Sequence, residues 1–170
     1  HGVGVKMRCQ SVLCLVAAGG SVLRGRDRAV VQCHAELPQL VYGTAWKKDA
    51  TPGLVEKAIR TGFRGIDTAC QPKHYNEQGV GEGIAAAAGL VARKELWLQS
   101  KFTPIRGQDP LRVPYDPASP TTAQASQSIA RSLENLKTEY LDCLLLHSPL
   151  ATLEDTVAVW RGFRGDGGAG

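Results

Sequence analysis

The segment "GIDTACQPKHYNE" (residues 65–77) starts as an apolar run and then breaks into a cluster of polar side chains. Asp67 follows the apolar residues directly, and Tyr75 comes a short loop later. A short apolar run bounded by such a break is typical of a buried β-strand. The segment therefore predicts a strand that ends in an aspartate and a tyrosine of chemical interest, with His74 expected to be a solvated loop residue.

Short apolar runs alternate with segments of helical pattern from residue 37 onward. Strands are expected at residues 39–45, 63–69, 95–102 and 141–149. Helices are expected from Thr51 to before Gly62, over residues 76–90, along the apolar stripe Ala125, Ile129, Leu133 and Leu136, and from Leu153 to Trp160. Four strand and helix units in strict alternation predict an α/β protein with a parallel sheet covered by helices.

Two of these helices carry signals at their ends or in their interior. Thr51 is expected to cap the first helix, with Pro52 at its first position and Gly62 in the left-handed conformation after its last turn. The second helix contains the glycines of "GVGEG" (79–83), which count against a helix on propensity alone. The segment 103–120 is rich in proline and glycine and is expected to be a loop.

Two architectures satisfy the alternation, an open doubly wound sheet and part of a (β/α)8 barrel of the TIM type. Asp67, Lys101 and His147 each follow a different predicted strand. Side chains that converge from several strand ends are how barrel enzymes build their sites. A dinucleotide site of the doubly wound type needs a Gly-rich turn after the first strand, and "GTAWKKDATPG" (43–53) lacks it. The barrel is therefore the favoured fold.

Composition limits the functional classes. A chain of 170 residues with 43% hydrophobic content can bury one ordinary core. From Glu36 onward it carries 15 basic and 15 acidic residues, so no basic face indicates nucleic acid, and no apolar run is long enough to cross a membrane. The five cysteines are irregularly spaced without a CxxC pair, which predicts reduced thiols, no metal site and a cytoplasmic location.

Residues 1–36 differ from the rest of the chain. Residues 1–35 carry five basic residues and one acidic residue, which together account for the whole net charge of +4. From Met7, the run "MRCQSVLCLVAAGGS" has the basic start, apolar centre and small residues of a presequence, which would direct the protein to an organelle or for secretion. An irregular basic arm or a translated leader is the alternative. Either interpretation predicts a poorly ordered leader before a domain that begins at residue 37.

The polar residues at the strand ends form a set that could move a proton. A phenol is a poor acid at neutral pH unless a nearby cation stabilises the phenolate, and Lys101 could supply that cation. Asp67 could hold the ammonium, and His147 could orient a substrate oxygen. Tyr75 would then act as a general acid that protonates a carbonyl oxygen while hydride arrives at the carbon. The hydride itself must come from a cofactor.

Five motifs in order resemble the aldo-keto reductases: "GTAW", "AIRTGFRGIDTA", "HYNEQGVGEGI", "LQSKF" and "LDCLLLHSP". The resemblance spans Leu40 to about Trp160. It implies a (β/α)8 barrel that reduces aldehydes or ketones, small-molecule carbonyl substrates, with NADPH. It also implies a catalytic set of four residues, whose counterparts by motif are Asp67, Tyr75, Lys101 and His147.

The same resemblance implies further contacts. Gly43, Thr44 and Ala45 match the loop of the first strand that lies against the nicotinamide, and Asp67 is expected to contribute to that site. Trp46 stands one position after the place where many members carry a tryptophan, and it is expected to line the substrate pocket together with His147.

The chain departs from the family pattern in three places. Seven residues separate Asp67 from Tyr75, which predicts a longer loop than usual, and the insert 103–120 extends the next one. About four of eight units are present, so residues 37–161 are interpreted as the amino-terminal part of a barrel and residues 162–170 as a Gly-rich tail. Such a partial barrel would expose its sheet edges and could self-associate through them.

Three hypotheses about function remain open at this level. The first is an NADPH-dependent reductase. The second is a truncated, non-catalytic fragment or binding subunit of the same family without a complete cofactor site. The third is an unrelated barrel enzyme, such as a metal-assisted hydrolase with Asp67 and His147 as ligands, although no cluster with ligand spacing supports it.

Overall fold

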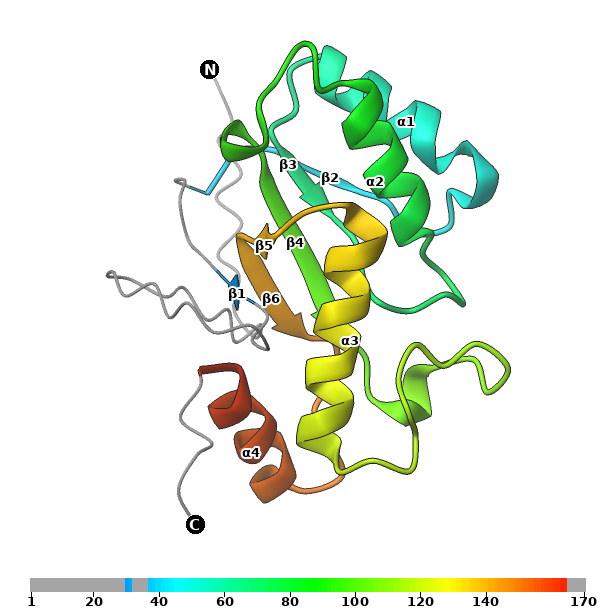
Figure 1. Ribbon diagram of the computed structural model, residues 1–170, viewed down its shortest axis with the longest axis vertical. Coiled ribbons are helices and arrows are strands. Elements are labelled where there is room, and N and C mark those ends of the chain that lie inside the picture. The colour runs from blue at the N-terminus through cyan, green and yellow to red at the C-terminus, as the bar shows by residue number, and fades with distance from the viewer. Residues whose placement is uncertain (1–29, 32–36, 165–170) are drawn as a thin grey trace, which may run out of the picture.

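The computed structural model describes residues 30–31 and 37–164, in which strands alternate with helices (Figure 1). The strands are β1 (Val30–Val31), β2 (Val41–Gly43), β3 (Gly65–Asp67), β4 (Trp97–Phe102), β5 (Tyr140–Leu141) and β6 (Cys143–Leu146). The α-helices are α1 (Thr51–Arg60), α2 (Glu77–Ala86), α3 (Thr121–Leu136) and α4 (Leu153–Arg164). Short 3-10 turns lie at η1 (Lys48–Ala50), η2 (Arg93–Glu95) and η3 (Ile105–Gly107).

The main sheet has four parallel strands in the order β2-β3-β4-β6, which is also their order along the chain. Successive helices pack against one another, α1 on α2, α2 on α3 and α3 on α4, and they lie together on one side of the sheet (Figure 1). A doubly wound sheet would reverse its strand order and carry helices on both faces. The arrangement is that of the first part of a (β/α)8 barrel, and the predicted fold class is confirmed.

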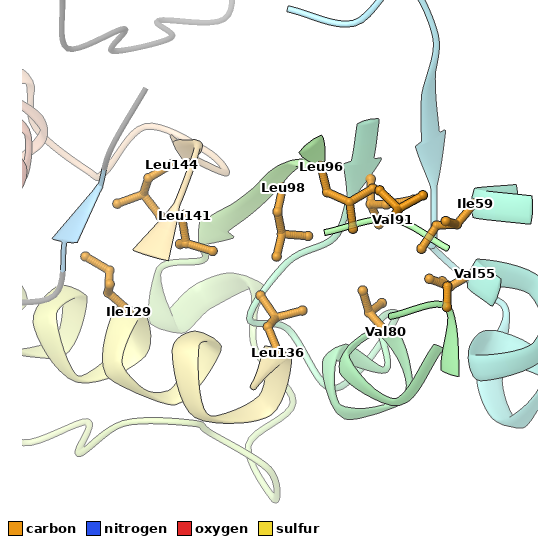
Figure 2. Packing of buried hydrophobic residues seen from close by; sticks show 12 residues of the cluster. Val55, Ile59, Val80, Val91, Leu96, Leu98, Ile129, Leu136, Leu141 and Leu144 are labelled. Atoms are coloured by element: carbon orange, nitrogen blue, oxygen red, sulfur yellow. The ribbon is translucent and has the colours of Figure 1, made fainter. Parts of the chain in front are cut away.

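The largest core cluster lies between the sheet and the helices (Figure 2). Figure 2 shows Leu98 of β4 pointing down from the sheet toward Leu136 of α3, while Val55 of α1 and Val80 of α2 lie on the helix side. These four side chains are at most 2% exposed. Burying such a side chain stabilises the fold by roughly 1.5–3 kcal/mol each. This cluster therefore fixes the helices to the sheet and, with them, the loops at the carboxyl ends of the strands.

The first helix begins differently from the prediction. Thr51 was expected to cap α1, but it is the first residue of the helix, and its hydroxyl donates to the main-chain oxygen of Lys48 at 2.6 Å. The residue before it, Ala50, provides no side-chain cap. The 3-10 turn η1 runs directly into α1, so a main-chain oxygen of η1 accepts the N–H at the start of the helix. The prediction for Gly62 is confirmed, since its φ of 104° is left-handed.

The last predicted strand, 141–149, is shorter and interrupted. Asp142 separates β5 from β6, and its carboxylate accepts the main-chain N–H of Leu98 at 3.0 Å and an N–H of Arg93 at 2.8 Å. The Asp142 carboxylate thus accepts the Leu98 N–H in place of a main-chain oxygen of the neighbouring strand. This interrupts the ladder of main-chain hydrogen bonds at that residue, as in a bulge. The buried ion pair thus joins η2 to the fourth unit of the barrel at the amino end of the sheet.

The described residues extend slightly beyond both predicted domain boundaries. Within the leader, Val30 and Val31 form β1, which pairs in parallel with β5; the rest of residues 1–36 lies outside the described part of the chain. Helix α4 continues to Arg164, past the boundary expected at residue 161, and residues 165–170 are not described. Among the helices that the structure describes, none combines the length and the apolar character needed to cross a membrane.

Candidate active site

Three of the predicted site residues lie where parallel strands end. Asp67 is the last residue of β3, Lys101 is the penultimate residue of β4, and His147 directly follows β6. The register places Asp67 opposite Gln99 of β4, and the His147 N–H donates to the main-chain oxygen of Phe102 at 2.8 Å. Because adjacent strands end side by side, these residues come together at one edge of the sheet. The predicted convergence is thus present in the structure.

Asp67 and Lys101 form the charged centre of the site. The Lys101 Nζ donates to Asp67 Oδ1 at 2.6 Å and to the main-chain oxygen of Thr68 at 2.7 Å. The side chain of Gln99 donates to the same Asp67 oxygen at 2.5 Å. The side chains of the pair are 11% and 22% exposed, so water screens this ion pair only in part. The lysine is therefore held in one position by the aspartate, as the sequence predicts.

Tyr75 reaches the same edge from the loop that precedes α2. The Lys101 Nζ lies 5.0 Å from the centroid of the Tyr75 ring, and the His147 ring packs edge-on against it with centroids 5.9 Å apart. The Tyr75 hydroxyl makes no hydrogen bond with any residue in the described part of the chain. The tyrosine thus lies between the ammonium and the imidazole with its hydroxyl available to another molecule.

The acidity of Tyr75 does not follow the expectation that Lys101 lowers its pKa. Burial raises the pKa of the phenol above 10.0, and the carboxylate of Asp67 raises it further. The physical reason is the short ion pair, because the negative charge of Asp67 offsets the positive charge of Lys101 at the phenol and leaves the cost of desolvation. Tyr75 is therefore fully protonated at neutral pH in the protein by itself.

His147 is held through its Nδ1 atom, which lies 2.7 Å from the hydroxyl oxygen of Thr103. Burial lowers the pKa of His147 below its usual value of 6.5, and the positive charge of Lys101 lowers it further. The imidazole is therefore neutral at neutral pH. A neutral imidazole keeps one N–H donor, which suits hydrogen bonding to a carbonyl oxygen better than donation of a proton.

The loop after β2 lies beside Asp67. Gly43 pairs with Asp67 in register, and Thr44 donates through both its main-chain N–H and its hydroxyl to the Asp67 carbonyl oxygen, at 3.1 and 2.9 Å. The Thr44 hydroxyl is thus used inside the protein. Gly43 is exposed and has no atom within 4 Å of the position of a side chain. Ala45 is half-buried beside it.

Trp46 and His74 stack on each other at the rim of the site. Their ring centroids are 4.0 Å apart, and the main-chain N–H of Trp46 donates to the main-chain oxygen of His74 at 2.7 Å. Trp46 is 64% exposed and has a φ of 62°, a conformation that is uncommon for a bulky residue. His74 lies in the loop before α2, as predicted, and is half-buried there as a packing partner of the residue expected to line the substrate pocket.

Two further residues that sequence reasoning did not identify belong to the site. Gln99 holds Asp67, and Thr103 holds His147. Both are ordinary polar residues whose type carries no catalytic signal. The useful signal was positional, because Gln99 and Thr103 lie two residues before and after Lys101, and side chains two apart on a strand share one face.

No cluster of three or more His, Cys, Asp or Glu side chains that could hold a metal ion occurs within residues 37–164. Asp67 is instead engaged with Lys101 and Gln99, and His147 with Thr103. The described geometry gives no support to the hypothesis of a metal-assisted hydrolase.

A model of the aldo/keto reductase family matches residues 40–163. The match covers well over half of the sequence, so this protein belongs to the aldo/keto reductase family. The hypothesis of an unrelated barrel enzyme is thereby wrong.

Curated relatives agree with that assignment. The chain is 32% identical over 128 residues to the methylglyoxal reductase DkgA of Salmonella typhimurium, a match that covers 74% of this chain and 39% of the relative. It is 36% identical over 120 residues to the NADPH-dependent D-xylose reductase of Meyerozyma guilliermondii, covering 68% of this chain and 33% of the relative. The matched region thus spans between a third and two fifths of these relatives.

Solved structures show the same relationship. An aldo-keto reductase of Bombyx mori in complex with NADP superposes with a TM-score of 0.58 at 28% identity, covering 76% of this chain and 42% of that chain. An aldo-keto reductase from a Medee basin deep-sea metagenome library gives a TM-score of 0.56 at 25% identity, covering 77% and 41%. The described residues therefore correspond to less than half of a complete family barrel.

Proposed function

We propose that this chain carries the proton-donating half of an NADPH-dependent reductase that converts aldehydes or ketones to alcohols. The observation that supports it best is the meeting of Asp67, Tyr75, Lys101 and His147 at one edge of the sheet, with a tyrosine hydroxyl that has no hydrogen-bond partner among the described residues and lies between an ammonium and a neutral imidazole. The relatives named as a methylglyoxal reductase and an NADPH-dependent D-xylose reductase support the reaction class.

Each side chain has a separate part in this proposal. The Tyr75 hydroxyl donates a hydrogen bond to the carbonyl oxygen and transfers its proton as negative charge develops there. The neutral His147 donates a second hydrogen bond that orients the same oxygen. Lys101, held by Asp67, lies over the Tyr75 ring, where its positive charge balances the negative charge of Asp67 beside the phenolate that proton transfer leaves behind. The raised pKa of Tyr75 keeps its proton in place until the substrate is bound.

The cofactor in this proposal is NADPH, which would supply the hydride when bound. One feature of the described residues fits its nicotinamide end: Gly43 leaves the end of β2 open beside Asp67, so a flat ring could lie against the main chain there. Gly43 and Ala45 would form that surface, and Thr44 would support it through its bonds to Asp67. Trp46, stacked on His74, would bound the substrate side.

The alternative proposal is a non-catalytic fragment or a binding subunit of the same family. Its support is the extent of the match, since the chain corresponds to about two fifths of its relatives, and the family resemblance places most contacts to the adenosine phosphate in later strands. The alternative predicts weak or absent binding of NADPH to this chain by itself. Titration of the purified chain with NADPH, followed by nicotinamide fluorescence, separates the two proposals.

The catalytic proposal is tested with Tyr75→Phe. Loss of a general acid lowers rate by roughly a hundredfold or more, so consumption of NADPH with a panel of aldehydes should fall by at least that factor while NADPH still binds. The control is Tyr42→Phe, which removes a phenol hydroxyl from β2 at a side chain packed on Phe63 and should leave the rate unchanged. Retention of full activity in Tyr75→Phe would refute the acid role.

A further inference from the structure

A buried threonine immediately after β4 determines how His147 presents its hydrogen. Thr103 is 2% exposed, and its Oγ1 atom lies 2.7 Å from Nδ1 of His147. At that distance one of the two atoms donates and the other accepts. Which atom carries the hydrogen decides whether the remaining ring nitrogen, Nε2, is a donor or an acceptor.

The hydroxyl hydrogen of Thr103 has His147 as its one acceptor within the described residues. If Nδ1 carried the ring hydrogen, it would donate to Thr103, and the hydroxyl hydrogen would be buried without an acceptor. A buried donor left without a partner destabilises the arrangement that contains it. The opposite arrangement, in which the hydroxyl donates and Nδ1 accepts, leaves no hydrogen without a partner. The second arrangement is therefore favoured.

We infer that Thr103 is a positioning residue that holds His147 in the tautomer with hydrogen on Nε2. This inference rests on the proposed function for its role in catalysis, because only a donor at Nε2 can hydrogen-bond a substrate carbonyl oxygen. The lowered pKa of His147 supports it, since a tautomer is defined only for the neutral ring.

Contacts around Thr103 fix its orientation. Its main-chain oxygen accepts hydrogen bonds from the Tyr115 hydroxyl at 2.9 Å and from the side chain of Gln108 at 3.1 Å. Its methyl group lies against Gly107, where an added Cβ atom would approach it to 2.8 Å. Gly107, Gln108 and Tyr115 all belong to the insert 103–120. These later residues of the insert thus hold the main chain and the methyl group of Thr103.

The insert is also tied to the loop that carries Tyr75. Gln108 donates to the main-chain oxygen of Cys70 at 2.9 Å, and Gln71 donates to that of Gly107 at 2.7 Å. The proline-rich insert therefore connects the loop that carries Tyr75 to Thr103, the residue that holds the His147 ring. These main-chain bonds do not depend on the Thr103 hydroxyl, so a change of that side chain should leave the backbone in place.

The test reads the tautomer directly. In the purified, 15N-labelled chain without cofactor, long-range 1H–15N spectra report which ring nitrogen of His147 carries hydrogen. The unaltered chain and Thr103→Ser should both show hydrogen on Nε2. Thr103→Val, which replaces the hydroxyl by a methyl group of similar size, should move the 15N shifts of both ring nitrogens toward each other as the Nδ1–H form becomes populated.

Two outcomes overturn the inference: hydrogen on Nδ1 in the unaltered chain, or unchanged ring shifts in Thr103→Val. If Thr103→Val does not fold, the unaltered chain and Thr103→Ser decide by themselves, because a serine that no longer fixes the tautomer also contradicts it. The result is independent of reductase activity. A fixed Nε2–H tautomer in a chain that reduces no carbonyl would contradict the proposed function and leave the role of Thr103 standing.

Discussion

Tyr75 shows that proximity of a cation is not sufficient to make a phenol acidic. Lys101 lies against the ring, yet the pKa of Tyr75 is raised because burial and the Asp67 carboxylate both oppose ionisation. The charges of Lys101 and Asp67 lie close together, so their effects on the pKa of Tyr75 nearly cancel. Desolvation raises that pKa, and no other effect of similar size offsets it. In this site the phenol keeps its proton at neutral pH. In the proposed mechanism, charge that develops on a bound substrate would draw that proton away.

Glu77 is a further residue whose pKa is shifted by the fold. It lies in the first turn of α2, is 5% exposed and accepts hydrogen bonds from Ser100 at 2.6 Å, Ser132 at 3.1 Å and Asn135 at 3.3 Å. Burial raises its pKa above 4.5, and the three donors offset this only in part. Because Ser100 precedes Lys101, this network fixes the start of α2, two residues after Tyr75, to the strand that carries the lysine.

The raised pKa of Glu77 predicts a stability that depends on pH. Below 4.5 the carboxyl is protonated in both states, and its contribution to stability is fully present. As pH rises from 4.5 through the folded-state pKa, the unfolded state releases its proton first, so the free energy of unfolding decreases. Urea unfolding measured between about pH 4 and about pH 8 should show this decrease.

Glu77→Gln should remove that decrease, because the amide has no proton to titrate. Its oxygen can still accept from Ser132 and Asn135, and its N–H can donate to Ser100, so the network survives. The matched control is Glu82→Gln on the exposed face of the same helix, which should keep the decrease. An unchanged pH profile in Glu77→Gln would show that another group is responsible.

The glycines of α2 are explained by its neighbours and not by its own helix propensity. A Cβ atom on Gly81 would lie 2.3 Å from the main-chain oxygen of Asn135, and one on Gly83 would lie 2.5 Å from that of Pro52. Helix α2 therefore approaches the ends of α3 and α1 closely at these two residues. The glycines that lower the helix propensity of this segment are therefore the residues that allow its helix to pack closely on its neighbours.

This packing predicts opposite effects for two Gly→Ala changes. Gly81→Ala should destabilise the protein by about 1–3 kcal/mol, because backbone atoms of α3 must move. Gly53→Ala, in α1, has no atom within 4 Å of the new Cβ and should stabilise it by about 0.5–1 kcal/mol through helix propensity. Thermal and urea unfolding measure both. Equal effects of the two changes would contradict the close approach of α2 and α3.

The elements that the sequence predicted well are those with a local signal. The apolar stripe through Ala125 and Leu136 identifies α3, and the left-handed Gly62 marks the end of α1. The misses depend on partners distant in sequence: Asp142 divides the last strand because it binds Arg93, and Thr51 lies inside a helix because η1 precedes it. Tertiary contacts of this kind leave no periodicity in a single sequence.

The same distinction applies to the site. Asp67, Lys101 and His147 could be predicted because each polar residue ends an apolar run. Thr103 was missed, because its contact is with a residue 44 positions away and its sequence signal is limited to its position two residues after Lys101. The direction of the pKa shift of Tyr75 could not be predicted either, since it depends on how closely Asp67 approaches Lys101.

At the scale of the whole molecule, the two edges of the sheet differ. Figures 1 and 2 both place β1 next to β5 and β6, on the side away from β4, so the short strand from the leader lies at that edge. At the other edge, β2 pairs only with β3 among the described strands. Leu37, Leu40 and Val41, before and within β2, are 69%, 67% and 38% exposed. In a closed barrel the first strand would pair with the last.

We propose that β2 is the edge through which copies of this chain associate, because an apolar edge strand with free main-chain groups is a template for pairing. Sedimentation velocity over a range of concentrations should show a dimer or larger species that dissociates on dilution. Val41→Lys places a charge in the strand and should shift the equilibrium to monomer, whereas Leu111→Lys, on a loop away from the sheet and 93% exposed, should not. A chain that is monomeric at every concentration, or that associates equally well with Val41→Lys, would show that the edge is covered in some other way.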